Sequence, residues 1–262
     1  AQHFKSIGVR DGLTDTCVES IAKDRYGYVW FATLNGLNRF DGYNIKKYSL
    51  KDFGLNFDQF KYVAEDKEGN IWTVSATGTI YLFDREKDCL TNNLNYALAP
   101  LGIYSDEITL IRVDDIGNLW IGANRILYHY DYTQAKLSTY ELPHPCFDVD
   151  SDGKDTYLSL HDGRIMHLVP TPPHEKFETI KNGEGRPSSM TLDSDGRLWT
   201  YGHLMFGKVM YYDKIRKTWN KLPDNELTDN DFIVAAVDDR NGHILFGSNS
   251  NGIISFSKDL SE

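Results

Sequence analysis

Few side chains in this sequence are spaced for catalysis. The eight histidines form no H-x-H or H-x-x-x-H pair, and no G-x-S-x-G motif is present, so neither a preorganised metal site nor a nucleophile is indicated. Cys17, Cys89 and Cys146 have unrelated spacings, which predict neither a disulfide framework nor a zinc site. We therefore expect no catalytic residues, no metal site and no cofactor.

An Asp-x-x-Gly motif recurs along the chain and could be read as a calcium loop. It is most suggestive at Asp150-Ser-Asp-Gly153 and Asp193-Ser-Asp-Gly196. A calcium loop needs six or more oxygen ligands, whereas each of these segments offers two or three side chains. Because Asp bonds nearby backbone N–H groups and Gly adopts the positive φ of tight turns, the motif is more typical of a structural turn.

A second set of polar residues could bind a ligand. All of them fall in one class of loop of the repeat described below: Asn35, Asn124, Arg125, His161, Asp162, His203 and Asn249. Amide, guanidinium and carboxylate groups hydrogen-bond to neutral sugars, so these are candidate ligand-binding residues. Ordinary solvated loop residues are the competing interpretation. Loops of a second class, such as residues 14–17 and 104–106, are expected on the same face.

An internal repeat must position these loops. Its Asp and Gly recur as Asp24 and Gly27, Asp66 and Gly69, Asp114 and Gly117, Asp150 and Gly153, Asp193 and Gly196, and Asp239 and Gly242. The glycines are 42, 48, 36, 43 and 46 residues apart, a period typical of propellers and solenoids. A short apolar run precedes each Asp and is too brief for a helix. A second strand follows the Gly, then a third that often ends on an aromatic-Asp pair, then a polar fourth.

Four antiparallel strands in each unit predict an all-β fold, a β-propeller of four-stranded blades. We expect one domain over residues 1–262, with blades centred near residues 27, 69, 117, 153, 196 and 242. A strand at residues 2–8 would complete the last blade, whose own third strand lies near residues 252–256. The six repeats could form a closed six-bladed ring or part of a seven-bladed propeller.

Tryptophan recurs at one position of the second strand. Trp30, Trp72, Trp120 and Trp199 each follow the turn Asp by six residues. A blade cannot bury both faces alone, so stacked neighbours must supply the core. We interpret these four residues as inter-blade packing rather than as a sugar-stacking row.

The charge of the chain excludes some functions. Its 28 Lys+Arg against 38 Asp+Glu give a net charge of -10, and no basic cluster is present, so binding to nucleic acid or to an anionic membrane is not expected. No apolar run is long enough to cross a bilayer, and no signal-peptide pattern is visible.

The first repeat closely resembles the two-component regulator propeller repeat. The resemblance rests on residues 11–18, 20–24 and 28–33 and on Asn35-Gly-Leu-Asn-Arg-Phe-Asp-Gly-Tyr43. Later copies keep the Asp, the Gly and usually the Trp. The resemblance implies part of the periplasmic sensor of a hybrid two-component system from Bacteroidetes. Such sensors carry a second propeller, a membrane helix and a cytoplasmic kinase.

The same resemblance implies the function and partners. The ligand would be a glycan-derived oligosaccharide that regulates polysaccharide utilisation, the kinase activity would lie outside this chain, and the full-length protein could be a homodimer. Two alternatives remain open. One is an enzyme similar to streptogramin lyases, in which His203 or His161 would act as a base together with magnesium. The other is a protein-interaction platform.

Overall fold

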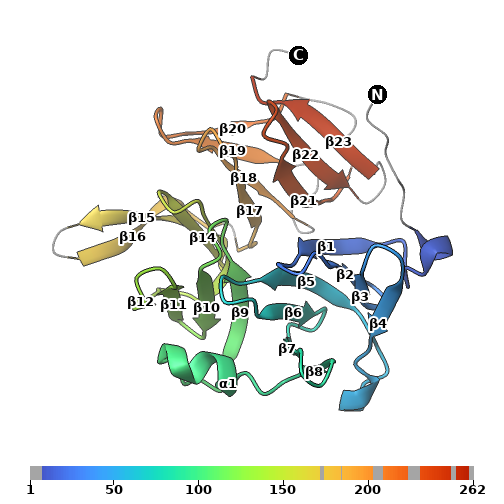
Figure 1. Cartoon of the computed structure of the whole chain (residues 1–262). Coiled ribbons are helices and arrows are strands. Elements are labelled where there is room, and N and C mark those ends of the chain that lie inside the picture. Colours follow the sequence, from blue (N-terminus) through green and yellow to red (C-terminus); the bar gives the residue numbers. More distant parts are fainter. Residues whose placement is uncertain are drawn as a thin grey trace. The chain divides into compact units, whose positions relative to one another are not determined.

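The computed structural model describes residues 8–171, 174–183, 185–202, 209–223, 231–248 and 252–259. These residues form six antiparallel sheets, each of which uses consecutive strands of the chain (Figure 1). Five sheets have four strands, and the last has three described strands. The predicted fold class, an all-β propeller of six blades, is confirmed.

The strands follow one another without crossovers. Blade 1 contains β1 (Val18–Lys23), β2 (Val29–Thr33), β3 (Gly36–Phe40) and β4 (Ile45–Tyr48). Blade 2 contains β5 (Phe60–Glu65), β6 (Ile71–Ser75), β7 (Ile80–Asp84) and β8 (Cys89–Thr91). Blade 3 contains β9 (Ile108–Val113), β10 (Leu119–Ala123), β11 (Ile126–Asp131) and β12 (Lys136–Glu141).

The remaining blades have the same order. Blade 4 contains β13 (Cys146–Ser151), β14 (Thr156–Leu160), β15 (Ile165–Thr171) and β16 (His174–Lys181). Blade 5 contains β17 (Ser189–Leu192), β18 (Leu198–Tyr201), β19 (Met210–Asp213) and β20 (Thr218–Lys221). Blade 6 contains β21 (Ile233–Asp238), β22 (His243–Ser248) and β23 (Gly252–Ser257). The strand expected at residues 2–8 falls almost wholly outside the described residues, and the described Gly8 is not in a strand.

The short helices were not expected from the repeat. The helix α1 (Asn95–Leu98) and the 3-10 turn η3 (Ala99–Leu101) lie between β8 and β9, and the 3-10 turns η1 (Val9–Asp11) and η2 (Lys51–Phe53) lie beside blade 1. Leu98 of α1 is 2% exposed and belongs to an apolar cluster with residues of blades 2 and 3. This burial explains why the connection between those blades is ordered rather than an open loop.

One carboxylate organises the first hairpin of a blade. In blade 1, Asp24 Oδ1 accepts hydrogen bonds from the backbone N–H groups of Tyr26 at 2.9 Å and Tyr28 at 3.0 Å. Its Oδ2 accepts a bond from Trp30 Nε1 at 3.0 Å. The same three bonds recur in two other blades. Asp66 accepts them from the backbone N–H groups of Glu68 and Asn70 and from the indole of Trp72. Asp193 accepts them from the backbone N–H groups of Asp195 and Arg197 and from the indole of Trp199. The repeat is therefore one hydrogen-bonded unit in which the turn and the tryptophan share a carboxylate.

Bonds of this unit also occur in blades 3 and 6. Asp114 Oδ1 accepts the backbone N–H of Ile116, and Asp239 Oδ1 accepts those of Asn241 and His243. The six repeat glycines all have positive φ, where a Cβ would be strained: Gly27, Gly69, Gly117, Gly153, Gly196 and Gly242.

Blade 4 departs from the expected register. Asp150 lies inside β13, and its Oδ2 accepts the backbone N–H of Leu192 in blade 5 at 2.7 Å. The turn carboxylate is Asp152, whose Oδ1 accepts the N–H groups of Lys154 and Asp155, both at 2.8 Å. Asp150 is therefore not the turn residue that the repeat predicted, because β13 continues two residues further before the chain reverses.

Trp30, Trp72 and Trp199 pack against the following blade. Trp30 is fully buried in a cluster with Phe60, Ile71 and Phe83 of blade 2. Trp72 is buried with Ile111, Leu119 and Ile121 of blade 3, and Trp199 with Ile233, Ile244 and Phe246 of blade 6. Trp120 is 1% exposed and stacks on His129 of its own blade at 3.9 Å between ring centroids.

The chain divides into two compact units, with the division inside blade 3. Unit 1 comprises residues 1–113, 117–123 and 128–139, and unit 2 comprises residues 114–116, 124–127 and 140–262. The expectation of a single domain over residues 1–262 stays a prediction. Among the described residues, no helix is both long and apolar enough to span a membrane.

Candidate functional site

Several of the sequence-predicted ligand residues are already engaged in hydrogen bonds. In unit 1, Asn35 donates from Nδ2 to the carbonyl of Thr14 at 3.2 Å and accepts a bond from Lys47 Nζ at 3.3 Å. In unit 2, Arg125 Nε donates to the carbonyl of Leu142 at 2.9 Å. These bonds fix loops, so Asn35 and Arg125 have local structural roles whether or not they also contact a ligand.

The remaining predicted residues of unit 2 also have local partners. Asn124 has a φ of 51°, as a residue of a tight turn often has. The Asp162 carboxylate pairs with Arg164 at 2.6 Å, and this pair lowers the pKa of Asp162. The ring of His161 packs edge-on against Phe147 with centroids 5.3 Å apart. His203 and Asn249 lie outside the described residues.

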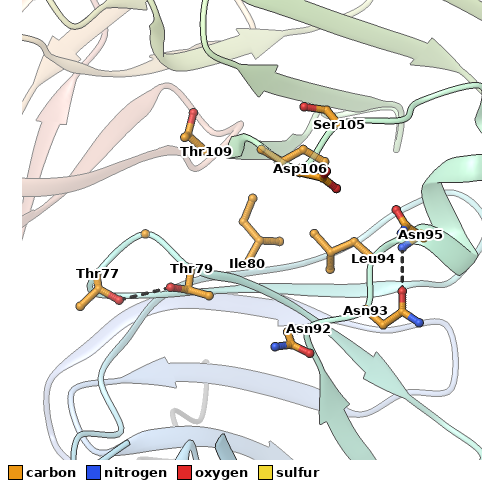
Figure 2. A pocket seen from close by; sticks show the side chains of 12 residues that line it. Thr77, Thr79, Ile80, Asn92, Asn93, Leu94, Asn95, Ser105, Asp106 and Thr109 are labelled. Atoms are coloured by element: carbon orange, nitrogen blue, oxygen red, sulfur yellow. Dashed lines mark hydrogen bonds between the residues drawn. The ribbon is translucent and has the colours of Figure 1, made fainter.

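A pocket of about 470 Å³ lies in unit 1, between blade 2 and the connection to blade 3. Three segments line it: the β6–β7 turn, the residues between β8 and α1, and the residues that lead into β9 (Figure 2). The lining residues are Thr77, Gly78, Thr79, Ile80, Asn92, Asn93, Leu94, Asn95, Ser105, Asp106, Ile108 and Thr109. The first and third segments belong to the two loop classes that were expected to meet on one face.

Local bonds hold each wall in place. Gly78 closes the β6–β7 turn with a φ of +91°, and its N–H donates to the carbonyl of Ser75 at 2.9 Å. Asn93 Oδ1 accepts the N–H of Asn95 at 3.3 Å, and Ser105 Oγ accepts that of Glu107 at 3.2 Å. The walls are therefore turns with internal hydrogen bonds, so a ligand would meet a largely pre-formed surface.

The lining is polar over an apolar centre. Figure 2 shows Ile80 and Leu94 in the middle, with Thr77 and Thr79 on one side and Asp106 on the other. Ile80 is 5% exposed and belongs to the core cluster of Trp72. Hydroxyl and amide groups make up most of the remaining lining, and among the described lining residues only Asp106 has an ionisable side chain.

Two exposed tyrosines adjoin the lining along the chain. Tyr96 follows Asn95 and is 50% exposed, and Tyr104 precedes Ser105 and is 76% exposed. Large apolar rings at the surface are available for contact with a ligand. Partial burial raises the pKa of Tyr96 above its ordinary value.

Only one side of this pocket could be predicted from the sequence, which places residues 104–106 in a face-lining loop. The sequence pattern does not single out residues 77–79 or 92–95. Asn92-Asn-Leu-Asn95 carries three amides in four residues, which was a usable signal. Its place opposite the β6–β7 turn depends on α1, which the repeat does not contain.

The described residues give no sign of metal or disulfide chemistry. No group of three or more His, Cys, Asp or Glu side chains within them is arranged to hold a metal ion. Cys17, Cys89 and Cys146, all within the described ranges, form no disulfide bond with one another.

Comparison with known proteins finds a match to the repeat and one curated relative over a short segment. Residues 12–35 match the two component regulator propeller family. A curated relative, Histidine kinase P4 of Formosa agariphila, is 44% identical over 45 residues, which is 17% of this chain and 3% of that protein.

Solved structures match nearly the whole chain at low identity. The extracellular domain assigned to hybrid two component system BT3049 of B. thetaiotaomicron matches with a TM-score of 0.66 and 18% identity, over 97% of this chain and 35% of that one. The extracellular domain assigned to one component system BT4673 of the same organism matches with a TM-score of 0.63 and 19% identity, over 94% and 36%. Virginiamycin B lyase from Staphylococcus aureus, solved in a catalytically inactive form with quinupristin, matches with a TM-score of 0.62 and 15% identity, over 92% and 80%.

The fold and the repeated turn define a β-propeller in which carboxylates and tryptophans link neighbouring blades within each unit. Residues 12–35 carry the two component regulator propeller repeat, and the fold resembles that of the extracellular domains from B. thetaiotaomicron. It spans about a third of the extracellular domains that it matches.

Proposed function

We propose that this chain is a non-catalytic part of the periplasmic sensor region of a hybrid two-component system, and that it binds a glycan-derived oligosaccharide. The observation that carries the proposal is the polar pocket on loops of an array of regulator propeller repeats. The structural similarity to extracellular domains of two-component systems supports the sensor role. In this proposal a second propeller, a membrane helix and a kinase belong to the rest of the protein, which could act as a homodimer.

Ligand binding tests the first half of the proposal. The intact extracellular region would be screened by thermal shift against a panel of plant and host oligosaccharides. The affinity of each oligosaccharide that stabilises the protein would then be measured by calorimetry. We expect stabilisation by one structural class of glycan, because a ligand that binds only the folded state raises the melting temperature. If no glycan stabilises the protein, the proposed ligand class is wrong.

Signalling tests the second half. In the full-length protein, addition of the binding glycan should change the rate at which the kinase domain incorporates phosphate from ATP. A glycan that binds without altering that rate would contradict a sensor role. A non-binding sugar of the same size serves as the control.

A further inference from the structure

The charge of the unit 1 pocket restricts the ligand class further. Resting on the proposed function, we propose that the pocket binds an uncharged oligosaccharide and discriminates against glycans that carry carboxylate or sulfate groups. Asp106 and Asn92 would hydrogen-bond to sugar hydroxyls, and Tyr104 would pack against a ring face.

The lining is rich in side chains that can both donate and accept hydrogen bonds. It contains the hydroxyls of Thr77, Thr79, Ser105 and Thr109 and the amides of Asn92, Asn93 and Asn95. Each amide can both donate and accept, and a hydroxyl can do the same. A sugar hydroxyl also has both capacities, so this lining complements a polyhydroxylated ring without needing a charge on the ligand.

The described lining residues include no cationic side chain. Recognition of carboxylate, sulfate or phosphate normally uses Arg or Lys, which form charge-assisted bonds to the anion. None of the described lining residues is Lys, Arg or His, and the carboxylate of Asp106 is present instead. An anionic group in the pocket would lose hydration and meet a like charge. Anionic glycans are therefore disfavoured relative to neutral glycans of equal size.

Two exposed tyrosines flank the lining segments along the chain. Tyr104 is 76% exposed and directly precedes the lining residue Ser105, while Tyr96 directly follows Asn95. Exposed aromatic rings offer apolar area at low entropy cost, and the C–H face of a pyranose is the apolar part of a sugar. Ile103, which precedes Tyr104, is 1% exposed and packs in the inter-blade cluster. The segment that presents Tyr104 is thus anchored in the core.

Calorimetry with matched ligands tests the proposal on the intact extracellular region. The probes are neutral tetrasaccharides (xylotetraose, maltotetraose and laminaritetraose) and anionic ones (tetragalacturonate and a sulfated carrageenan tetrasaccharide). We expect at least one neutral probe to bind and each anionic probe to bind at least about tenfold more weakly, a difference equivalent to about 1.4 kcal/mol.

Three variants locate the binding site. Asn92→Ala and Tyr104→Ala should each lower the affinity for the neutral probe at least about fivefold. Asp106→Asn should reduce the difference in affinity between neutral and anionic probes, because it removes the negative charge while keeping an acceptor oxygen. Asn92, Tyr104 and Asp106 are exposed, so their replacement should leave the melting temperature unchanged. Asn241→Ala, an exposed amide in the turn of blade 6, is the matched control and should bind as the parent does.

The outcomes separate this inference from the proposed function. Neutral binding that is lost in the Asn92 and Tyr104 variants supports both. Binding of a glycan that is unaffected by all three variants, or a preference for the anionic probes, overturns the inference and leaves the sensor role standing. The absence of binding by any glycan in the wider panel counts against the proposed function itself.

Discussion

The indole N–H of Trp72 and the phenol of Tyr132 donate to the same oxygen, Asp66 Oδ2, at 2.8 and 2.9 Å. Trp72 lies in blade 2, six residues after Asp66, whereas Tyr132 follows the third strand of blade 3. The side chain of Asn70 donates to this oxygen as well, at 2.9 Å. One buried carboxylate therefore closes a turn, orients a core tryptophan and joins two blades.

A related contact occurs at other blade junctions. The residue after the aromatic-Asp pair of one blade reaches the turn region of the preceding blade. Arg85 Nη2 lies 3.5 Å from Asp24 Oδ2, and Lys214 Nζ pairs with Asp155. The turn sequence thus contributes to inter-blade contacts as well as to chain reversal.

Loss of the Asp66 carboxylate should destabilise unit 1 strongly. Asp66→Ala would leave the buried indole N–H of Trp72 and several part-buried donors without their acceptor, and a buried donor left unsatisfied costs about 1–3 kcal/mol. We expect the free energy of unfolding, measured by urea denaturation, to fall by about 3–5 kcal/mol. Asp239→Ala is the matched control, because Asp239 accepts equivalent turn bonds at an exposed site, and it should cost about 1 kcal/mol or less. Equal losses in the two variants would refute a special role for the shared carboxylate.

Removal of a tyrosine hydroxyl should change the free energy of unfolding in opposite directions at two positions. Tyr157 occupies the tryptophan position of blade 4 and is fully buried, and its hydroxyl has no hydrogen-bond partner within the described part of the chain. Tyr157→Phe should stabilise the protein by about 1 kcal/mol, because it removes an unsatisfied buried polar group. Tyr132→Phe should destabilise it by about 1–2 kcal/mol, because its hydroxyl donates to Asp66. Both effects are measurable as shifts in the urea midpoint, and a loss of stability in Tyr157→Phe would contradict the first.

Asp150 should make the stability of unit 2 depend on pH. Burial, with the charges of Asp115 and Asp148, raises its pKa from 3.8 to about 7. Between these two pH values the folded state holds a proton that the unfolded state has lost, so this group lowers the free energy of unfolding as the pH rises through the window. Asp150→Asn keeps an acceptor for the N–H of Leu192 and removes the charge. It should be more stable than the parent at pH 8, by on the order of 2 kcal/mol, and close to it at pH 4.

Urea denaturation at pH 4, 6 and 8 checks this expectation. Asp52→Asn, an exposed carboxylate in η2, controls for the change in net charge and should show no such trend. A gain for Asp150→Asn that is the same at all three pH values would argue against titration of this carboxyl.

Glycine should be tolerated, and preferred, at a strained hairpin position. The residue four positions after the aromatic-Asp pair has a positive φ in three blades: 52° at Asp88, 48° at Ala135 and 54° at Lys217. An L-residue in this conformation costs about 1–2 kcal/mol, whereas glycine does not pay it. Ala135→Gly should therefore raise the melting temperature. Glycine also increases the entropy of the unfolded chain, so the net gain in the free energy of unfolding should be about 0.5–1 kcal/mol. Ala76→Gly, in an exposed turn residue whose φ is not positive, should give no gain, and a lower melting temperature for Ala135→Gly would contradict the strain argument.

The strands and their order could be predicted from the sequence because they depend on local interactions. The Asp-x-x-Gly turns bond to residues within four positions, and each strand pairs with its neighbour along the chain. The extent of β13 could not be predicted in the same way. Asp150-Ser-Asp-Gly153 contains two candidate turn residues, and the bond from Leu192 of the next blade to Asp150 is a tertiary contact.

The candidate site shows the same division. The sequence alone indicated loop classes with polar residues and named Asn35, Asn124, Arg125, His161 and Asp162, whose local bonds are compatible with loop structure as well as with binding. Only the tertiary structure brought Thr77, Asn92 and Asp106 around one pocket, since α1 and the buried Leu98 set the path between blades 2 and 3. Short-range turn chemistry fixed the blades, whereas long-range packing decided which loops meet.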